Sequence, residues 1–417
     1  MLNRELKIKL KKKMPIPTMT NAQNAKKDEF YTQYLDVEKE MSAYLEFDEN
    51  VFRGKTILLP CDDPEWSNFT KFFAQNFERF GLKKLISTSY AVESKNYKSN
   101  YQPTLFEINN PQFDEQKTRI KGKIFTLTRD KTGDGVIDVN DLEWDYLEGD
   151  GDFRSDEIKK LRDESDIIIT NPPFSLFRDF LAWIVEANKQ FVIIGNMNAI
   201  SYKEVFPLIM ANKMWTGNRF NRRVNGKNMT FYVPDDYKLS GTEVDVDDKG
   251  KKMISVAGTG WYTNLEHGRR HQPLSLMSMD DNIKFSKHKE VRGKEYVKYD
   301  NYDAIEIPFT DSIPSDYDGI MGVPISFLTK HNPEQFEILG LTQRGCHDAV
   351  PDTKTYNDYW EVKQSREKTG SSGGKTNGNA NVVGNDGRKN YFINKEGRIV
   401  QSKYQRIFIK HKKWLQL

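Results

Sequence analysis

The segment Asp166-Ile-Ile-Ile-Thr170-Asn171-Pro172-Pro173-Phe174 places polar acceptors directly after a short apolar run. The run predicts a buried strand that ends at Thr170. Two successive prolines remove two backbone donors and fix the direction of the chain, so that carbonyl groups face outward. Asn171 adds a side-chain carbonyl oxygen beside the carbonyl of Pro172, and Phe174 adds a flat aromatic face. Two acceptors and a ring suit a planar amine.

Methylation of an exocyclic amino group is the reaction that this arrangement favours. Such a nitrogen is a poor nucleophile because its lone pair is delocalised into the ring, and two acceptors that draw it toward tetrahedral geometry raise its reactivity in the transition state. A sulfonium methyl donor is already activated, so in-line positioning can supply much of the remaining acceleration. An amino group in RNA or a protein glutamine fits the same acceptors. A turn that merely ends a strand is the other interpretation.

Gly151-Asp152-Phe153 is a second candidate, with Asp152 lying 19 residues before Asn171. A carboxylate at this position can accept a hydrogen bond from the amino group of a bound adenine, while Phe153 contributes its backbone N–H and an apolar neighbour. An aspartate that caps the start of a helix gives the same sequence.

Short apolar runs alternate with helical patterns around both candidates. The apolar runs predict strands, and the spacings of three and four predict helices. This alternation is typical of an α/β fold with a covered parallel sheet, which binds ligands beyond the carboxyl ends of its strands. We therefore expect chemistry in the turns after Leu59, Leu147 and Thr170. The expected strands are 56–60, 82–88, 166–170 and 191–194, and the expected helices are 29–47, 68–80, 155–163 and 177–188.

Three regions are less regular. Residues 91–145 predict an insertion with a hairpin around Lys123 to Thr128, and residues 212–345 carry aromatic-rich stretches that suggest strands and loops. Residues 364–388 consist of Gly, Ser, Asn and Lys with almost nothing apolar, which is typical of a flexible loop. Tyr391 to Ile409 returns to a strand-like pattern.

The charge is distributed unevenly. The whole chain of 417 residues carries +3, but residues 363–413 contain 13 Lys and Arg against 3 Asp and Glu, a local charge of +10. Residues 4–13 form another basic cluster. Such segments attract a polyanion such as nucleic acid, and a solvated tail is the alternative.

Composition excludes several classes of protein. A hydrophobic share of 37% and no run of about 18 apolar residues indicate a soluble globular chain of two or three domains, expected in the cytoplasm. Cys61 and Cys346 are too few for a disulfide framework or a zinc site. The segment from Asp130 to Asp141 nearly spells a calcium loop, but its twelfth residue is Asp in place of the bidentate Glu. We expect an ordinary turn there and no metal.

The strings around these candidates resemble the EcoRI-type adenine-specific DNA methyltransferases. The resemblance covers about residues 27–345. The matching strings are NPPFSLFRDF, IIGNMNAISYKEVFPLI, LLPCDDPEWSNF, WYTNL (261–265), YDNYDAIEI (299–307), DYDGIMGVPISFL (316–328) and PEQFEILGL (333–341).

The resemblance implies transfer of a methyl group from S-adenosylmethionine to the N6 amino group of adenine in double-stranded DNA, after the adenine is flipped out of the helix. It implies a Rossmann-like class I methyltransferase sheet with inserted and C-terminal target-recognition elements. The glycine-rich cofactor loop of most methyltransferases is replaced by a Pro-Cys-Asp-Asp-Pro turn, and the strand ending Ser87-Thr88-Ser89 lacks the acidic residue that commonly holds a ribose. A DNA-binding relative that has lost catalysis is the alternative from another class.

Site residues follow from the resemblance by position. The catalytic residues are Asn171, Pro172, Pro173 and Phe174; the cofactor residues are Tyr31, Thr32, Pro60, Asp62, Asp63, Asp152 and Phe153; the DNA contacts are Arg219, Arg222, Arg223, Lys403 and Arg406.

We expect a flexible basic arm (1–25), an S-adenosylmethionine-binding catalytic domain (26–277) and a C-terminal recognition region (278–417) that contains the flexible loop 364–388. The expected partner is double-stranded DNA, without a membrane, and the protein is expected to be a monomer. A functional pairing with a restriction endonuclease is left open.

Overall fold

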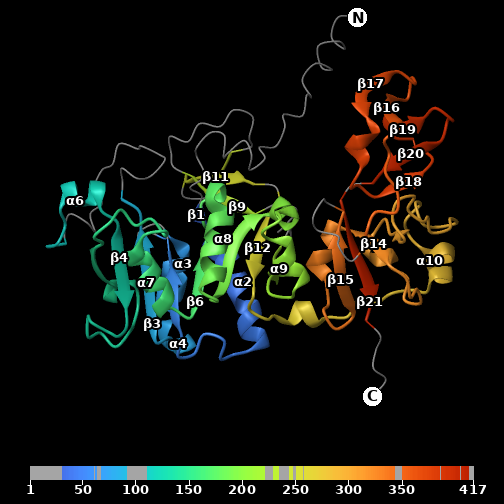
Figure 1. Ribbon diagram of the computed structural model, residues 1–417. Coiled ribbons are helices and arrows are strands. Elements are labelled where there is room, and N and C mark those ends of the chain that lie inside the picture. Colours follow the sequence, from blue (N-terminus) through green and yellow to red (C-terminus); the bar gives the residue numbers. More distant parts are fainter. Residues whose placement is uncertain are drawn as a thin grey trace, which may run out of the picture. The chain divides into compact units, whose positions relative to one another are not determined.

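The computed structural model divides the chain into two compact units (Figure 1). Unit 1 comprises Met1–Ala199 and Thr216–His267, and unit 2 comprises Ile200–Trp215 and Gly268–Leu417. The expected basic arm 1–25 lies outside the described residues. None of the described helices is both long and apolar enough to cross a membrane. The structure describes residues 31–60, 62, 67–91, 110–220, 229–233, 244–247, 250–256, 258–342, 350–385, 387–403 and 405–412.

An eight-stranded mixed sheet lies at the centre of unit 1, in the order β5-β4-β3-β2-β6-β7-β12-β8. Strands β3, β2, β6 and β7 are parallel, whereas β4, β5 and β12 run antiparallel to their neighbours. The α/β fold class is thereby confirmed. The strands are β2 (Thr56–Leu59), β3 (Lys84–Ser89), β4 (Lys123–Leu127), β5 (Glu143–Tyr146), β6 (Ile167–Thr170), β7 (Gln190–Asn196), β8 (Trp215–Thr216) and β12 (Thr259–Thr263).

The helices of unit 1 lie close to their predicted positions. The predicted helix 68–80 is divided at Asn76, and Gly81 ends it in the left-handed conformation at φ 62°. Ser67 caps the start of α3, because its side chain accepts the backbone N–H groups of Phe69 and Thr70. The helices are α2 (Tyr34–Phe47), α3 (Asn68–Gln75), α4 (Phe77–Phe80), α6 (Glu115–Ile120), α7 (Asp156–Glu164) and α8 (Phe177–Glu186).

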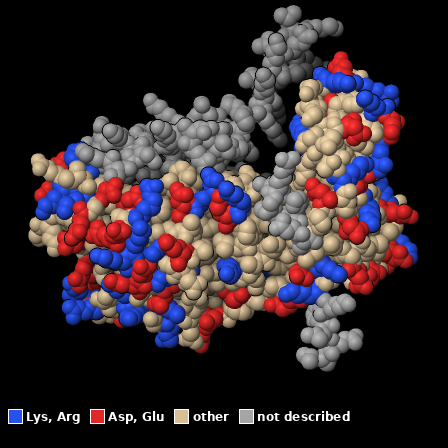
Figure 2. Space-filling model, viewed as in Figure 1, with Lys and Arg blue, Asp and Glu red and all other residues tan. Residues whose placement is uncertain are grey.

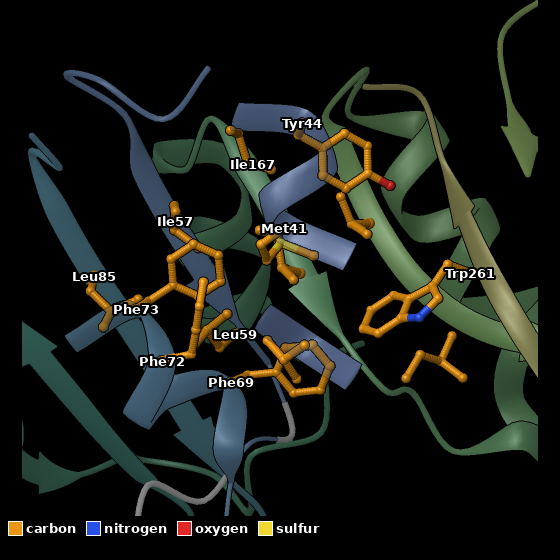
Figure 3. Packing of buried hydrophobic residues seen from close by; sticks show 14 of the residues in the cluster. Met41, Tyr44, Ile57, Leu59, Phe69, Phe72, Phe73, Leu85, Ile167 and Trp261 are labelled. Atoms are coloured by element: carbon orange, nitrogen blue, oxygen red, sulfur yellow. The ribbon is translucent and has the colours of Figure 1, made fainter. Parts of the chain in front are cut away.

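Strands β2 and β6 are buried over their full length, as expected for central strands covered on both faces. The alternate residues Ile57 and Leu59 of β2 face a core cluster formed with α2 and α3. Figure 3 shows Phe69, Phe72 and Phe73 of α3 packed there. This packing fixes α3 against the sheet, and α3 in turn begins directly after the polar turn that follows β2.

A second sheet of unit 1 has four short strands in the order β1-β9-β11-β10. Thr32 of β1 lies opposite Phe231 of β9, and Phe231 belongs to the same core cluster as β2 and β6. This small sheet therefore packs against the main sheet of unit 1. Its strands are β1 (Tyr31–Thr32), β9 (Thr230–Tyr232), β10 (Val244–Val246) and β11 (Lys252–Ser255).

Unit 2 contains a four-stranded sheet, β13-β14-β21-β15, and a five-stranded sheet, β17-β16-β19-β20-β18. Short helices α9 (Phe206–Met210) and α10 (Met279–Phe285) accompany them. The strands are β13 (Ile305–Glu306), β14 (Met321–Pro324), β15 (Phe336–Leu341), β16 (Tyr359–Lys363), β17 (Lys368–Ser372), β18 (Asn381–Val383), β19 (Asn390–Asn394), β20 (Ile399–Ser402) and β21 (Arg406–His411).

Two expectations about organisation need correction. The segment 364–388 is not a loop throughout, because it contains β17 and β18, whose polar residues are ordered by backbone pairing with β16 and β20. The predicted division at residue 277 also differs from the observed one. Unit 2 begins at Gly268 and includes Ile200–Trp215, because α9 packs against β15.

A fully buried carboxylate ties α2 to the turn that follows β8. The Glu40 side chain accepts hydrogen bonds from the Tyr44 hydroxyl at 2.7 Å and from the backbone N–H groups of Asn218 and Arg219, both at 2.8 Å. A side chain at Gly217 would collide with this carboxylate, since an added Cβ would lie 2.3 Å from Oε1. Burial outweighs the three donors and raises the pKa of Glu40 from 4.5 to about 7.

Glu40→Gln should flatten the pH dependence of stability. Because the folded pKa is raised, the stabilising contribution of Glu40 is complete below about pH 4.5 and is lost as the pH rises through about 7. That interval corresponds to about 3 kcal/mol of unfolding free energy. Urea unfolding at pH 5, 6, 7 and 8 measures it. A difference between wild type and variant that stays constant over this range would contradict the assignment.

Candidate functional site

Four polar turns meet at the carboxyl ends of the parallel strands of unit 1. The backbone N–H of Asp62, after β2, donates to the carbonyl of Thr88 in β3 at 2.8 Å. The backbone N–H of Ala91, in the second turn, after β3, donates to the carbonyl of Asp150 at 2.8 Å. Asp150 belongs to the third turn, which follows β5. The fourth turn begins at Asn171, directly after β6, which pairs with β2. The three turns predicted from the sequence are thus connected, through the end of β3, at one edge of the sheet.

Asp62 lies at the centre of this edge and is almost fully buried. Its Oδ1 accepts the Ser67 hydroxyl at 2.9 Å, and its Oδ2 accepts the Thr170 hydroxyl at 2.5 Å. Its backbone carbonyl accepts the hydroxyl of Ser87, which also contacts Thr70. Both carboxylate oxygens are therefore bonded within the protein. The contact of this carboxylate with the methyl donor stays a prediction, since each of its oxygens keeps a second lone-pair site.

The turn that begins at Asn171, predicted to be catalytic, leaves β6 and leads through a short 3-10 helix, Phe174–Leu176, into α8. Asn171 and Pro173 are partly exposed, whereas Pro172 is buried. Phe174 is only 5% exposed, and its ring lies edge-to-face with that of Phe231, with centroids 6.3 Å apart. The ring predicted to stack on a base thus lies in the core cluster beside Phe231 of the small sheet.

The Gly151-Asp152-Phe153 turn is held against the end of β3. Gly151 has φ 87°, and an added Cβ would lie 2.4 Å from the carbonyl oxygen of Ser89. Arg154 donates to both oxygens of Asp152, at 2.9 Å through Nε and 2.6 Å through Nη2, and this hydrogen bonding lowers the pKa of Asp152. Two carboxylate oxygens offer about four lone-pair sites, so capacity remains for an adenine amino group.

Phe153 does not line the turn with its ring. The ring is fully buried between Phe180 and Trp183, with centroid distances of 5.0 and 5.7 Å. Any contact of this residue with the donor therefore involves its backbone, in agreement with the role expected for its N–H group.

Two buried hydroxyl groups near these turns have no hydrogen-bond partner among the residues that the structure describes: Thr32 Oγ1 in β1 and Thr88 Oγ1 near the end of β3. β1 is joined to α3, since Asn68 donates to the carbonyl of Thr32 at 2.8 Å. Unsatisfied buried hydroxyls cost free energy unless a ligand pairs with them. They suit S-adenosylmethionine, whose ribose and amino-acid groups both donate and accept.

Thr88 is a candidate that the sequence analysis missed. It is the second-last residue of β3, the strand in which an acidic ribose ligand was looked for and not found, and a hydroxyl can bond a ribose in place of a carboxylate. The signal in the sequence that could have identified Thr88 was its position near the end of a predicted strand. Of the remaining cofactor candidates, Pro60 accepts the Thr170 hydroxyl at 2.8 Å, Tyr31 lies in β1, and Asp63 lies outside the described residues.

The expected DNA contacts need correction at two positions. Arg406 is buried and paired with Glu306, with Nη2 2.6 Å from Oε1 and Nε 3.0 Å from Oε2. It is a core residue of unit 2 and does not face solvent. The Arg219 side chain is 11% exposed and lies 3.5 Å from Asp36. Lys403 is partly exposed and remains a candidate, while Arg222 and Arg223 lie outside the described residues.

The segment that resembles a calcium loop is folded by its own backbone. Asp141 accepts the N–H groups of Lys131, Thr132 and Asp138 at 2.8 to 2.9 Å, and Asp130 accepts those of Gly133 and Gly135. Within the described part of the chain, no group of three or more acidic, His or Cys side chains is arranged to hold a metal ion.

The geometry defines an α/β protein with an acceptor-rich turn at the carboxyl end of a central parallel strand. The chain belongs to the family described as adenine-specific methyltransferase EcoRI, whose model matches residues 18–412. It is therefore an S-adenosylmethionine-dependent adenine methyltransferase of DNA.

Named relatives agree with this membership. The chain is 42% identical to the type II methyltransferase M.EcoRI of Escherichia coli over 320 residues, which cover 76% of this chain and 87% of that protein. Over the same share of this chain it is 35% identical to M.MgeORF184P of Mycoplasma genitalium and 32% identical to M.MpnI of Mycoplasma pneumoniae, covering 84% and 83% of those proteins. No solved structure matches the chain significantly.

Gly151→Ala should weaken donor binding. The new Cβ would force the Ser89 carbonyl away from the turn and strain the backbone at φ 87°, displacing Asp152. We expect an affinity for S-adenosylmethionine at least tenfold lower by calorimetry, and a stability loss of about 1–3 kcal/mol. Gly149→Ala is the matched control, because its nearest neighbour would be Glu157 Oε2 at 4.0 Å. Equal donor affinity in both variants would contradict this reading.

Proposed function

We propose that the Asn171–Phe174 turn transfers the methyl group of S-adenosylmethionine directly to the N6 amino group of an adenine in double-stranded DNA, at a specific site. The observation that carries this proposal is the position of Asn171. It follows the last residue of β6, where β6 lies beside β2 and strand order reverses from the β3 side to the β7 side. In open α/β sheets such a switch point is where ligands bind.

We infer on the same basis that the main sheet of unit 1 is a Rossmann-like class I methyltransferase sheet and that unit 2 carries target-recognition elements. The four parallel strands β3, β2, β6 and β7, flanked by the antiparallel β12, support the first inference. The basic C-terminal region of the sequence supports the second. The N-terminal segment 1–25, which includes a basic cluster, completes the proposed organisation.

The chemistry at the turn rests on acceptors that the chain supplies. Asn171 Oδ1 and the carbonyl of Pro172 accept the two N–H groups of the adenine N6, which draws the nitrogen lone pair toward the incoming carbon. S-adenosylmethionine supplies a methyl group already activated by a sulfonium centre. The new C–N bond forms as the S–CH3 bond breaks, and N6 then releases one proton to water. No covalent enzyme intermediate is required.

An adenine inside a duplex cannot reach this turn, so it must be flipped out. Phe174 is nearly fully buried and contacts Phe231, so stacking on the flipped base requires the two rings to move apart. The small sheet that carries Phe231 also carries Tyr31 and Thr32, the proposed donor contacts. Opening of the base pocket and binding of the donor therefore involve the same small sheet.

Removal of the Asn171 amide tests the assignment most directly. Asn171→Ala should lower methyl transfer by about 10²-fold or more, as loss of one transition-state contact commonly does, while the dissociation constant for S-adenosylmethionine changes less than about threefold. Incorporation of tritiated methyl groups into DNA, RNA and protein, measured in parallel, also separates the alternative substrates. Asn50→Ala, in an exposed turn, is the control. Undiminished labelling of DNA by Asn171→Ala would contradict the catalytic role assigned to Asn171.

The DNA surface that we propose is the basic end of the five-stranded sheet in unit 2. The hairpin of β16 and β17 exposes Lys363, Arg366 and Lys368 around its tip, beside Lys389. Glu367 is the acidic residue of this tip, 3.4 Å from Lys363. Exposed Lys and Arg side chains near β16 and β17 are visible at the upper right of Figure 2.

The opposite end of that sheet is electrostatically different. Arg398 and Lys354 both pair with the buried carboxylate of Asp300, which neutralises part of their charge. The hairpin tip keeps a local excess of cations. Strand β17, Lys-Thr-Gly-Ser-Ser, has no apolar residue and presents hydrogen-bonding side chains on both faces. A two-stranded ribbon of this kind fits the major groove, with its cations on phosphates.

Replacement of the three hairpin cations should weaken DNA binding uniformly across sequences. For Lys363→Gln, Arg366→Gln and Lys368→Gln combined, we expect the slope of log K against log salt to fall by up to about 2.7, because each lost phosphate contact contributes about 0.9. Lys284→Gln, Lys289→Gln and Lys294→Gln, exposed elsewhere in unit 2, form the control. Fluorescence anisotropy at several salt concentrations measures both, and equal slopes would exclude the hairpin as a contact.

We further propose that the enzyme acts as a monomer, in the cytoplasm, as the modifying partner of a restriction endonuclease. The type II names of the relatives support the pairing. Analytical ultracentrifugation with and without target DNA tests the monomer.

A further inference from the structure

Thr170 occupies the position immediately before the proposed catalytic Asn171. It ends β6, and its side chain is fully buried. Its hydroxyl lies 2.5 Å from Asp62 Oδ2 and 2.8 Å from the carbonyl oxygen of Pro60. A hydroxyl has a single proton to donate, and an ionised carboxylate is the stronger acceptor. The principal anchor of Thr170 is therefore the carboxylate of Asp62.

Asp62 is itself fixed by two other elements, α3 and β3. Ser67 at the start of α3 bonds its second carboxylate oxygen, Ser87 bonds its carbonyl, and Thr88 accepts its N–H. In a buried, low-dielectric site a fully bonded polar network is rigid. Asp62 thus cannot follow a movement of Thr170, and the hydrogen bond holds the end of β6 against β2, β3 and α3.

We propose that Asp62 and Thr170 are positioning residues for the catalytic turn, an inference that rests on the proposed function. Thr170 is β-branched, so anchoring its Oγ1 restricts χ1 and with it the local backbone. Pro172 and Pro173 have fixed φ angles and carry that direction onward. The Asp62–Thr170 hydrogen bond thereby sets where the Asn171 amide and the Pro172 carbonyl point.

The same carboxylate connects the two halves of the reaction. Through Ser67 it is bonded to the start of α3, whose first residue, Asn68, holds β1 and the donor candidate Thr32. Through Thr170 it is bonded to the turn that is proposed to bind the adenine N6 amino group. Asp62 therefore fixes the donor side and the acceptor side of the proposed site relative to each other. A misplacement of about 1 Å between reacting groups can cost about 10²-fold in rate.

Thr170→Val tests this role, because valine keeps the shape and the β-branch but lacks the hydroxyl. We expect the single-turnover rate of methyl transfer to DNA to fall about 10- to 100-fold. The dissociation constants for S-adenosylmethionine and for DNA, measured by calorimetry and anisotropy, should change less than about threefold. Thr170→Ser, which retains the hydroxyl, should restore the rate to within about threefold of wild type.

Thr263→Val is the matched control. Thr263 is also a buried threonine that ends a strand, and it donates to the carbonyl of Phe191 at 2.8 Å at the other edge of the sheet. Its replacement should lower the unfolding temperature without lowering the rate. If Thr170→Val does not unfold cooperatively, Asp62→Asn takes its place and should show the same loss of rate with retained donor affinity.

Three results would overturn the positioning role: a Thr170→Val rate within threefold of wild type, an equal loss in Thr170→Ser, or a loss of donor affinity as large as the loss of rate. Each of these leaves the proposed function standing if wild type methylates DNA. Failure of wild type to label DNA would instead defeat the proposed function, and the positioning role with it.

Discussion

The hydrogen bonds of Asp62 are the constraint on which the site depends. β2, β3 and β6 are neighbouring strands of the main sheet, and apolar packing alone would leave their three carboxyl ends free to shift against one another. One buried carboxylate with its own backbone groups joins all three ends and the start of α3. A polar group at this depth is costly unless every partner is in place. The polar turns that follow β2 and β6 are therefore held in one fixed arrangement relative to each other.

Much of unit 1 could be predicted from the sequence. Thr56–Leu59 and Ile167–Thr170 are short continuous apolar runs, and this pattern is strong because central strands are covered on both faces. The catalytic turn was predictable for a related reason, since Asn-Pro-Pro-Phe combines acceptors and stiff backbone in adjacent residues. The α/β class follows from these local signals.

The failures have a common physical cause, which is dependence on residues distant in sequence. Arg406 was predicted to be a surface cation that contacts DNA. Its partner Glu306 lies 100 residues away in the sequence, and no local sequence pattern indicates a buried ion pair. The burial of Phe174 was not predicted, because its neighbour Phe231 lies on another sheet; its role in stacking stays a proposal. Strand β17 was read as loop because Lys-Thr-Gly-Ser-Ser has no apolar periodicity. Its order comes from backbone pairing with β16, which composition does not report.

The contact between Phe174 and Phe231 also implies a threshold for substrate entry. An edge-to-face pair is worth about 0.5–1.5 kcal/mol, so the open form is a minority in the resting enzyme. An energy of this size lowers the apparent affinity for an extruded base by the reciprocal of the open fraction, roughly three- to fourteenfold. A base that leaves the helix by chance usually meets the closed form, in which Phe174 and Phe231 are still in contact. Only a duplex that stays bound to the protein long enough keeps its base extruded until the two rings separate. Discrimination between DNA sites therefore depends partly on the rate of ring separation, before methyl transfer begins.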